Sequence, residues 1–194
     1  MVGVRQFDET RVIREALRLF SERGLSGTTM GDLAQASGVL RGSLYNAYGG
    51  KDEIFILAFE SYTREVLTRF REALDRPTLR EALQGAFTAA IRSIRGNAER
   101  RGCLTTRMAL EDHAHQERIR AGLEHLLGEL ETMLAQALEP LCAAGDNRMP
   151  APVMARLIVT FTRGLAVIDR IYDDGARLRG DADALLGLMC PQEA

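Results

Sequence analysis

The sequence has few cysteines and a single lysine, and it lacks the features of several common classes of protein. Its three cysteines, at positions 103, 142 and 190, are an odd number and lie far apart. This pattern argues against a secreted scaffold held by disulfides. No run of about 18 apolar residues is present to form a transmembrane helix. The first eleven residues lack the apolar core of a signal peptide, so we expect a cytoplasmic protein that does not associate with a membrane.

Catalytic and metal-binding signatures are also missing. The two glycines and the lysine at 49–51 are too short a run for a P-loop, and no nucleophile with a neighbouring base stands out. Four neighbouring residues have side chains that could bind a metal ion: Glu111, Asp112, His113 and His115. However, His113 and His115 would point about 200° apart on a helix, and no Cys-x-x-Cys or His-Glu-x-x-His accompanies them. We expect a polar patch there, no metal or other cofactor, and no enzymatic activity.

The composition is typical of a globular protein with one small and one larger domain. Apolar residues make up 46% and charged residues 27% of the 194 positions, which is enough to bury a substantial core. No stretch alternates with period two over a convincing length, whereas apolar residues recur at helical spacing along the chain. The predicted fold class is therefore all-α, with about nine helices.

Glycine, proline and capping residues predict where these helices begin and end. The expected helices span residues 8–23, 29–37, 41–48, 51–74, 79–94, 103–115, 116–144, 151–172 and about 181–189. Pro140 should kink the 116–144 helix or end it early, because proline cannot donate a backbone hydrogen bond. A loop over 173–180 should precede the last helix.

Residues 28–51 carry the most informative pattern. Thr29 is a good N-cap, and Asp32, three residues later, can complete a capping box. Gly38 stands where a left-handed residue ends a helix, and a second helix of about two turns follows over 41–48. Two helices joined by a short turn containing glycine form a helix-turn-helix, whose second helix enters the major groove of DNA. A helical hairpin in a protein-interaction module would have the same spacing, so this alternative stays open.

The outward face of the second helix suits DNA. Its side chains are Arg41, Ser43, Tyr45 and Asn46. Arginine can bind guanine or phosphate, asparagine can bind adenine through two hydrogen bonds, and hydroxyl groups can bind phosphate oxygens. Leu40 offers this helix no side-chain cap, which costs about 1 kcal/mol.

The charge distribution agrees with a DNA-facing N-terminus. The net charge of −2 and the pI near 6.0 argue against a protein that coats nucleic acid without specificity. Residues 1–51 nevertheless carry seven basic and five acidic side chains, a net charge of +2 that leaves −4 for the remainder. The sequence therefore predicts a weakly basic head on an acidic body.

The run TTMGDLAQASGVLRGSLYNAYGGKDEIF resembles the N-terminal domain of the TetR family of bacterial regulators. The matching positions are Met30, Leu33, Ala34, Gly38, Val39, Gly42, Ser43, Leu44, Tyr45, Lys51 and Ile54. Leu40 and Tyr48 depart from the pattern, since the family usually has serine and phenylalanine there. The resemblance implies a DNA-binding domain at 1–51, with the start of a linking helix to about residue 60, and an effector-binding and dimerisation domain at 52–194.

The resemblance also implies a function. Such a protein is a transcriptional regulator, here expected to be a repressor, that binds double-stranded DNA at an inverted repeat as a homodimer. Its last two helices form the dimer interface, and here both are apolar on more than one face. A small-molecule or electrophile effector in the body would release the DNA. Transferred to this sequence, the expected DNA contacts are Thr28, Thr29, Arg41, Gly42, Ser43, Tyr45, Asn46, Tyr48 and Lys51.

The stretch RRGCLTTRMALEDHAH resembles an R-G-C-L motif of one branch of the family, near the effector cavity. Cys103 would lie at a helix N-terminus beside Arg100 and Arg101, where dipole and charge favour a thiolate sensor. The alternative, which the frequent burial of free cysteines favours, is that Cys103 is a small core residue that packs and does not react. Arg107 and Asp169 stand out because a charge on an apolar face must meet a partner or a ligand. The effector candidates are Phe59, Tyr62, Phe87, Ile91, Cys103, Arg107, Met108, Met133, Phe161 and Asp169.

Overall fold

The computed structural model describes residues 7–96, 103–111, 117–144 and 149–190. Across these ranges the chain forms nine α-helices and no strand, which confirms the predicted all-α fold. The helices are α1 (Glu9–Arg23), α2 (Met30–Ser37), α3 (Arg41–Tyr48), α4 (Lys51–Leu74), α5 (Leu79–Arg95), α6 (Leu104–Leu110), α7 (Glu117–Ala144), α8 (Ala151–Tyr172) and α9 (Gly175–Met189).

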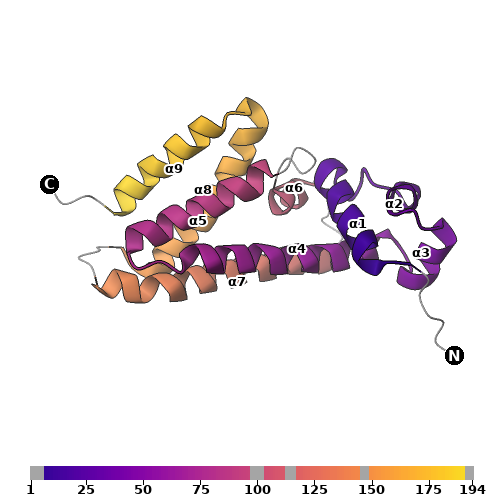
Figure 1. Cartoon of the computed structure of the whole chain (residues 1–194), viewed down its shortest axis with the longest axis horizontal. Coiled ribbons are helices and arrows are strands. Elements are labelled where there is room, and N and C mark those ends of the chain that lie inside the picture. The colour runs from indigo at the N-terminus through magenta and orange to yellow at the C-terminus, as the bar shows by residue number, and fades with distance from the viewer. Residues whose placement is uncertain (1–6, 97–102, 112–116, 145–148, 191–194) are drawn as a thin grey trace.

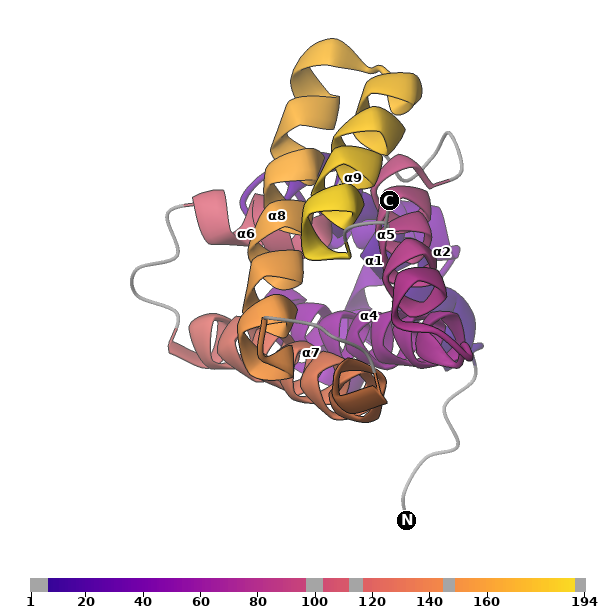
Figure 2. The same ribbon diagram turned by 90° about the vertical axis from the view of Figure 1, so that its left-hand side faces the viewer.

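The helices form a small N-terminal group and a larger bundle. Figure 1 shows α1, α2 and α3 together at one end, with α4 running from them along the body beside α7. In Figure 2, α8 rises from the layer formed by α4 and α7 with α9 beside its upper part, and α5 packs against both α8 and α9. The short α6 contacts α1, α7 and α8. It therefore connects the body to the N-terminal group.

Aromatic contacts run from the N-terminal group into the body. Phe20 of α1 meets Phe55 of α4 edge to face, with ring centroids 5.2 Å apart. Phe55 stacks on Phe59 at 5.8 Å, and Phe59 contacts Tyr62 at 6.1 Å. Large buried rings resist displacement because packed interiors leave few voids. The first half of α4 is thus packed against both parts of the molecule.

Local capping explains why the N-terminal helices lie where the sequence predicts them. Asp8 caps α1 by accepting from the Arg11 N–H. Thr29 and Asp32 form the predicted capping box at the start of α2. Gly38 ends α2 in the left-handed conformation, with φ 71° and ψ 21°. Leu40 makes no side-chain cap for α3, as predicted.

The structure differs from the expected bounds of α9 and α6, and α7 does not end early at Pro140. α9 begins at Gly175 and not near residue 181. The Asp174 carboxylate caps this helix by accepting from the Ala176 and Arg177 N–H groups. α7 continues through Pro140 to Ala144; Gln136, whose carbonyl loses its partner, is exposed to solvent. α6 ends at Leu110, and the expected continuation over 112–115 lies outside the described residues.

α8 is the most apolar helix and qualifies the expectation of no membrane-spanning segment. By length and composition it could cross a membrane, because its most apolar stretch of 18 residues has a mean hydropathy of 1.5. A core helix of a globular protein meets the same criteria. α8 packs against α5, α7 and α9, and 44% of that stretch is buried. Its position here is that of a bundle helix.

Candidate DNA-binding and effector sites

The turn between α2 and α3 presents one face of α3 to solvent. Leu44 points inward and is fully buried, which orients the helix on the N-terminal core. Arg41, Tyr45 and Asn46 are exposed, and Ser43 is half-buried. The Arg41 guanidinium lies over the Tyr45 ring, 5.5 Å from its centroid. Arginine and asparagine on one exposed helical face are suited to reading base edges in a major groove.

Two predicted DNA contacts are not presented to solvent. Thr28 is fully buried, and its hydroxyl donates to the Gly24 carbonyl at 2.7 Å. Tyr48 is 8% exposed, and its ring contacts Phe7 at a centroid distance of 6.2 Å. Both side chains fill the interior of the N-terminal group, so we remove them from the DNA-contacting set. Thr29, by contrast, is exposed beside the capping box.

Lys51 has a structural bond that the sequence did not indicate. Its Nζ donates to the Leu25 carbonyl at 2.8 Å, across 26 residues. This bond ties the first turn of α4 to the turn between α1 and α2. An ammonium carries three N–H donors, so the bond leaves Lys51 two donors for a phosphate.

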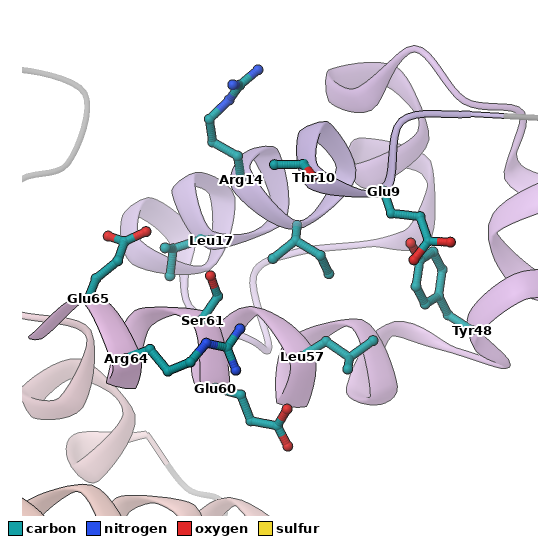
Figure 3. A pocket seen from close by; sticks show the side chains of 11 residues that line it. Glu9, Thr10, Arg14, Leu17, Tyr48, Leu57, Glu60, Ser61, Arg64 and Glu65 are labelled. Atoms are coloured by element: carbon teal, nitrogen blue, oxygen red, sulfur yellow. The ribbon is translucent and has the colours of Figure 1, made fainter. Parts of the chain in front are cut away.

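An open groove of about 470 Å³ lies between α1 and α4 (Figure 3). Ile13 and Leu17 of α1 line it together with Leu57 of α4, which the helical pattern places in the core but which is 41% exposed. Its other lining side chains include charges of both signs, among them Glu60 and Arg64. None of the predicted effector residues lines this groove.

The structure gathers some predicted effector residues into one cluster. The Tyr62 ring contacts Phe59, and its hydroxyl lies 3.8 Å from Cys103 Sγ. A second pair, Phe87 and Phe161, meets edge to face at 5.8 Å. Ile91 and Met108 are buried and Met133 is half-buried, and all three belong to the same apolar core as Cys103. The described residues thus define one polar cluster at Cys103 within an apolar body.

Cys103 is a buried thiol in a polar environment. Its Sγ lies 2.8 Å from Thr105 Oγ1, which accepts from the Arg163 guanidinium at 3.0 Å. Burial raises the pKa of the Cys103 thiol, but the Arg163 charge and hydrogen bonds from Thr105 and Thr106 outweigh it, and the pKa falls below its ordinary value. The expected arginines at 100 and 101 lie outside the described residues. The positive charge comes from α8, which no sequence pattern linked to Cys103.

The two charged candidates, Arg107 and Asp169, do not pair with each other. Asp169 accepts from Arg95 at 2.5 Å, and Arg95 also pairs with Asp173 at 3.2 Å. Burial, and next the charge of Arg170, lower the pKa of Arg107. The Arg107 Nε is buried and has no hydrogen-bond partner among the described residues. Asp169 therefore has a protein partner, whereas Arg107 keeps an unsatisfied donor.

Glu111 connects α6 to the N-terminal group, a role that the sequence did not indicate. Its Oε2 accepts from the Leu25 N–H at 3.2 Å and from the Ser26 N–H at 3.4 Å. A Cβ at Gly24 would overlap Glu111 Oε1. Gly24 also has a φ of +76°, which favours glycine. The turn between α1 and α2 is therefore held by Glu111 on its amide side and by Lys51 on its carbonyl side.

Known proteins share both the N-terminal sequence and the whole fold. Residues 12–58 match the family described as "Bacterial regulatory proteins, tetR family". The chain is 25% identical over 189 residues to the HTH-type transcriptional regulator YezE of Bacillus subtilis, covering 95% of this chain and 97% of YezE. It is 35% identical over 80 residues to the repressor KstR2 of Mycobacterium tuberculosis, covering 41% of this chain and 40% of KstR2.

Solved structures agree with these sequence matches. The fold is similar to that of the TetR family regulator CifR, a cysteine mutant complexed with operator DNA, with a TM-score of 0.83 and 25% identity over 95% of this chain and 98% of that one. A second CifR mutant with operator DNA superposes with a TM-score of 0.86, at 24% identity over 97% of this chain and all of that one. The matched N-terminal segment, the full-length likeness to YezE and the fold similar to that of CifR indicate a DNA-binding transcriptional regulator that resembles the TetR family.

Proposed function

We propose that the protein binds an inverted-repeat operator as a homodimer, acts as a repressor, and releases the DNA when an effector binds in the body. The observation that carries this proposal is the exposed face of α3, where Arg41, Tyr45 and Asn46 follow the left-handed turn at Gly38. The match of residues 12–58 to the TetR-family model favours DNA binding over the alternative of a module that binds only proteins. The proposed DNA contacts are Thr29, Arg41, Gly42, Ser43, Tyr45, Asn46 and Lys51.

A gel shift with the DNA upstream of the chain's own gene tests this function. Wild-type protein should retard a fragment that contains an inverted repeat. Asn46→Ala should lose about 1–3 kcal/mol of discrimination at the base pair that it reads. Gln136→Ala, an exposed change on α7, is the matched control and should bind as wild type. Failure of the wild-type protein to retard any upstream fragment would count against operator binding.

We further propose that α8 and α9 form the dimer interface. Both helices leave large apolar side chains in solvent: Ile171 is 67% exposed and Leu188 is 78% exposed. Leu157, Gly164 and Ile171 are spaced by seven residues, so they share one face of α8. Exposed apolar faces of this kind are typical of surfaces that a partner covers. A two-fold interface here would pair the two reading heads with an inverted repeat.

Two glycine substitutions separate this interface from the fold of the monomer. A Cβ at Gly164 of α8 or at Gly128 of α7 would meet no atom within 4 Å, so arginine at either site leaves the monomer undisturbed. Gly164→Arg should place a long charged side chain in the dimer interface and shift the protein to monomers in sedimentation equilibrium. Gly128→Arg should remain a dimer. A Gly164→Arg variant that is still dimeric at the same concentration would locate the interface elsewhere.

We propose that the effector site lies at the Cys103 cluster and that the protein belongs to the R-G-C-L branch of the family. The proposed effector is an electrophile that alkylates the Cys103 thiol. The lowered pKa of Cys103 supports this assignment, because the thiolate is the reactive form. Treatment with N-ethylmaleimide should release operator from the wild-type protein and not from Cys103→Ser. Equal release of operator from the wild-type protein and from Cys103→Ser would show that Cys103 is only a core residue and not the alkylated sensor.

The route from this site to the DNA follows α6. Cys103 immediately precedes α6, and Glu111 immediately follows it. A ligand that shifts α6 therefore also shifts the carboxylate that holds the turn at Leu25 and Ser26. Glu111→Ala should keep operator binding but weaken its dependence on alkylation of Cys103. Unchanged release by alkylation in this variant would show that the signal follows another contact.

A further inference from the structure

Hydrogen-bond donors from two helices, α4 and α6, reach Cys103 Sγ, and Arg163 of α8 lies behind one of them. Thr105 Oγ1 already accepts from Arg163, which leaves the Thr105 hydroxyl hydrogen to point at the sulfur 2.8 Å away. Burial, and next the Cys103 charge, raise the pKa of Tyr62 well above its ordinary value, so its phenol stays protonated and can donate across 3.8 Å. Thr105 and Tyr62 thus both direct a hydrogen at the sulfur, and Arg163 donates to the Thr105 oxygen behind it.

Among the described residues, the charges around Cys103 are positive and come from Arg163 and Arg69. The Arg163 Nε is buried without a hydrogen-bond partner, and its guanidinium pairs with no carboxylate among the described residues. The Arg69 charge is close enough to lower the pKa of Tyr62, and Arg69 donates to the Ser93 hydroxyl, which is neutral. Asp169, a carboxylate on the same helix as Arg163, is paired with Arg95. Partly buried positive charge is costly unless an anion compensates it.

We propose that this cluster is an anion site, which selects effectors carrying a carboxylate or comparable oxyanion and holds that group on the unpartnered N–H of Arg163, beside Cys103. The inference rests on the proposed effector site and names the chemical class of its ligand. A guanidinium with a free N–H is suited to an oxyanion because charge-assisted hydrogen bonds are the strong ones. An anionic electrophile is thereby held beside the nucleophilic sulfur.

Iodoacetate and iodoacetamide test the site without knowledge of the natural effector. In both reactions the thiolate attacks the CH₂ carbon, a C–S bond forms, the C–I bond breaks and iodide leaves. The reagents are similar in size and differ in charge. Peptide mass mapping gives separate rates for each cysteine, so Cys142, on α7, serves as the reference. The ratio of the iodoacetate rate to the iodoacetamide rate should be about ten- to a hundredfold higher at Cys103 than at Cys142, the range of one charge-assisted hydrogen bond.

Variants of α8 assign this preference to Arg163. Arg163→Gln should bring the ratio at Cys103 down to that at Cys142, whereas Arg163→Lys, which keeps the charge, should retain most of the preference. Arg156→Gln, an exposed arginine on the same helix, is the control and should change nothing. If circular dichroism shows that Arg163→Gln does not fold, the iodoacetate to iodoacetamide rate ratio at Cys103 of the wild-type protein is compared at low and high salt. Added salt should lower this ratio if it depends on charge, and an unchanged ratio would count against the anion site.

Equal ratios at Cys103 and Cys142 in the wild-type protein, or an unchanged ratio in folded Arg163→Gln, would overturn the anion site. Operator gel shifts on the same samples separate this inference from the proposed function. Operator binding with equal ratios refutes the anion site alone. A strong preference for iodoacetate in a protein that retards no operator refutes the regulatory function and leaves the anion site standing.

Discussion

The contact between Gly24 and Glu111 can be measured by a double-mutant cycle. Gly24→Ala introduces two separate costs. The alanine must adopt φ +76°, and its Cβ must displace the Glu111 carboxylate from its position against the backbone. Since that carboxylate is the end of a flexible side chain, it can move away, but it then loses its bonds to the Leu25 and Ser26 N–H groups.

The expected magnitudes follow from these contacts. Strained backbone at a non-glycine residue costs about 1–3 kcal/mol. Hydrogen bonds to a charged acceptor contribute about 1.5–3 kcal/mol when buried, and about 1 kcal/mol is reasonable here because Glu111 is half-exposed. Gly24→Ala should therefore lower the free energy of unfolding by about 2–4 kcal/mol and Glu111→Ala by about 1 kcal/mol. The double variant should lose about 1 kcal/mol less than their sum, because the contact can be lost only once.

Urea unfolding followed by circular dichroism measures these values, since the chain has no tryptophan. All variants are compared at one protein concentration, because a dimer is stabilised by mass action. Glu117→Ala, an exposed glutamate at the start of α7, is the matched control and should add to Gly24→Ala without coupling. Additivity of Gly24→Ala and Glu111→Ala within about 0.3 kcal/mol would refute the contact and the proposed route through α6.

Three further variants test the N-terminal group. Leu40→Ser supplies the missing cap of α3 and should raise the free energy of unfolding by about 1 kcal/mol in urea; no gain would mean that the first turn is already satisfied. Lys51→Met removes the bond to the Leu25 carbonyl, costing about 1 kcal/mol, and should reduce the salt slope of operator binding by about 0.9. Lost stability with an unchanged slope would assign Lys51 to structure alone. Hydrogen bonds from the Thr29 side chain and backbone lower the pKa of Asp32 in the folded protein. The ionised Asp32 therefore stabilises the fold at pH values above its pKa in the unfolded chain, and this contribution is lost as the pH falls through its pKa in the folded protein. Asp32→Asn should therefore flatten the acid limb of stability against pH, and an unchanged limb would contradict this.

The sequence was most informative where structure depends on neighbours along the chain. The helices α1 to α4 and α8 were predicted to within a residue or two at each end. Capping by Asp8 and Thr29 and the turn at Gly38 are interactions between residues at most four apart. The predicted start of α9 is wrong because the polar residues Asp173 and Asp174 do not form a loop: Asp173 ends α8 in a left-handed conformation, and Asp174 caps α9.

The site residues depended more on the tertiary structure. Thr28 and Tyr48 were predicted as DNA contacts from the family resemblance, but both are buried, which follows from how α1, α3 and α4 pack and not from the helical periodicity of a single segment. Arg163 and Glu111 were missed for the same reason. Arg163 reaches Thr105 across 58 residues, and Glu111 reaches Leu25 across 86.

The sequence by itself therefore determined the all-α class, the helix-turn-helix and the outward face of α3, because caps, left-handed glycines and helical periodicity are local. Only the tertiary structure decided which charges meet: Arg163 beside Cys103, Asp169 with Arg95, and Glu111 with Lys51 on either side of one turn. Electrostatic pairing depends on distance in space, and that distance is set by how α4, α6 and α8 pack.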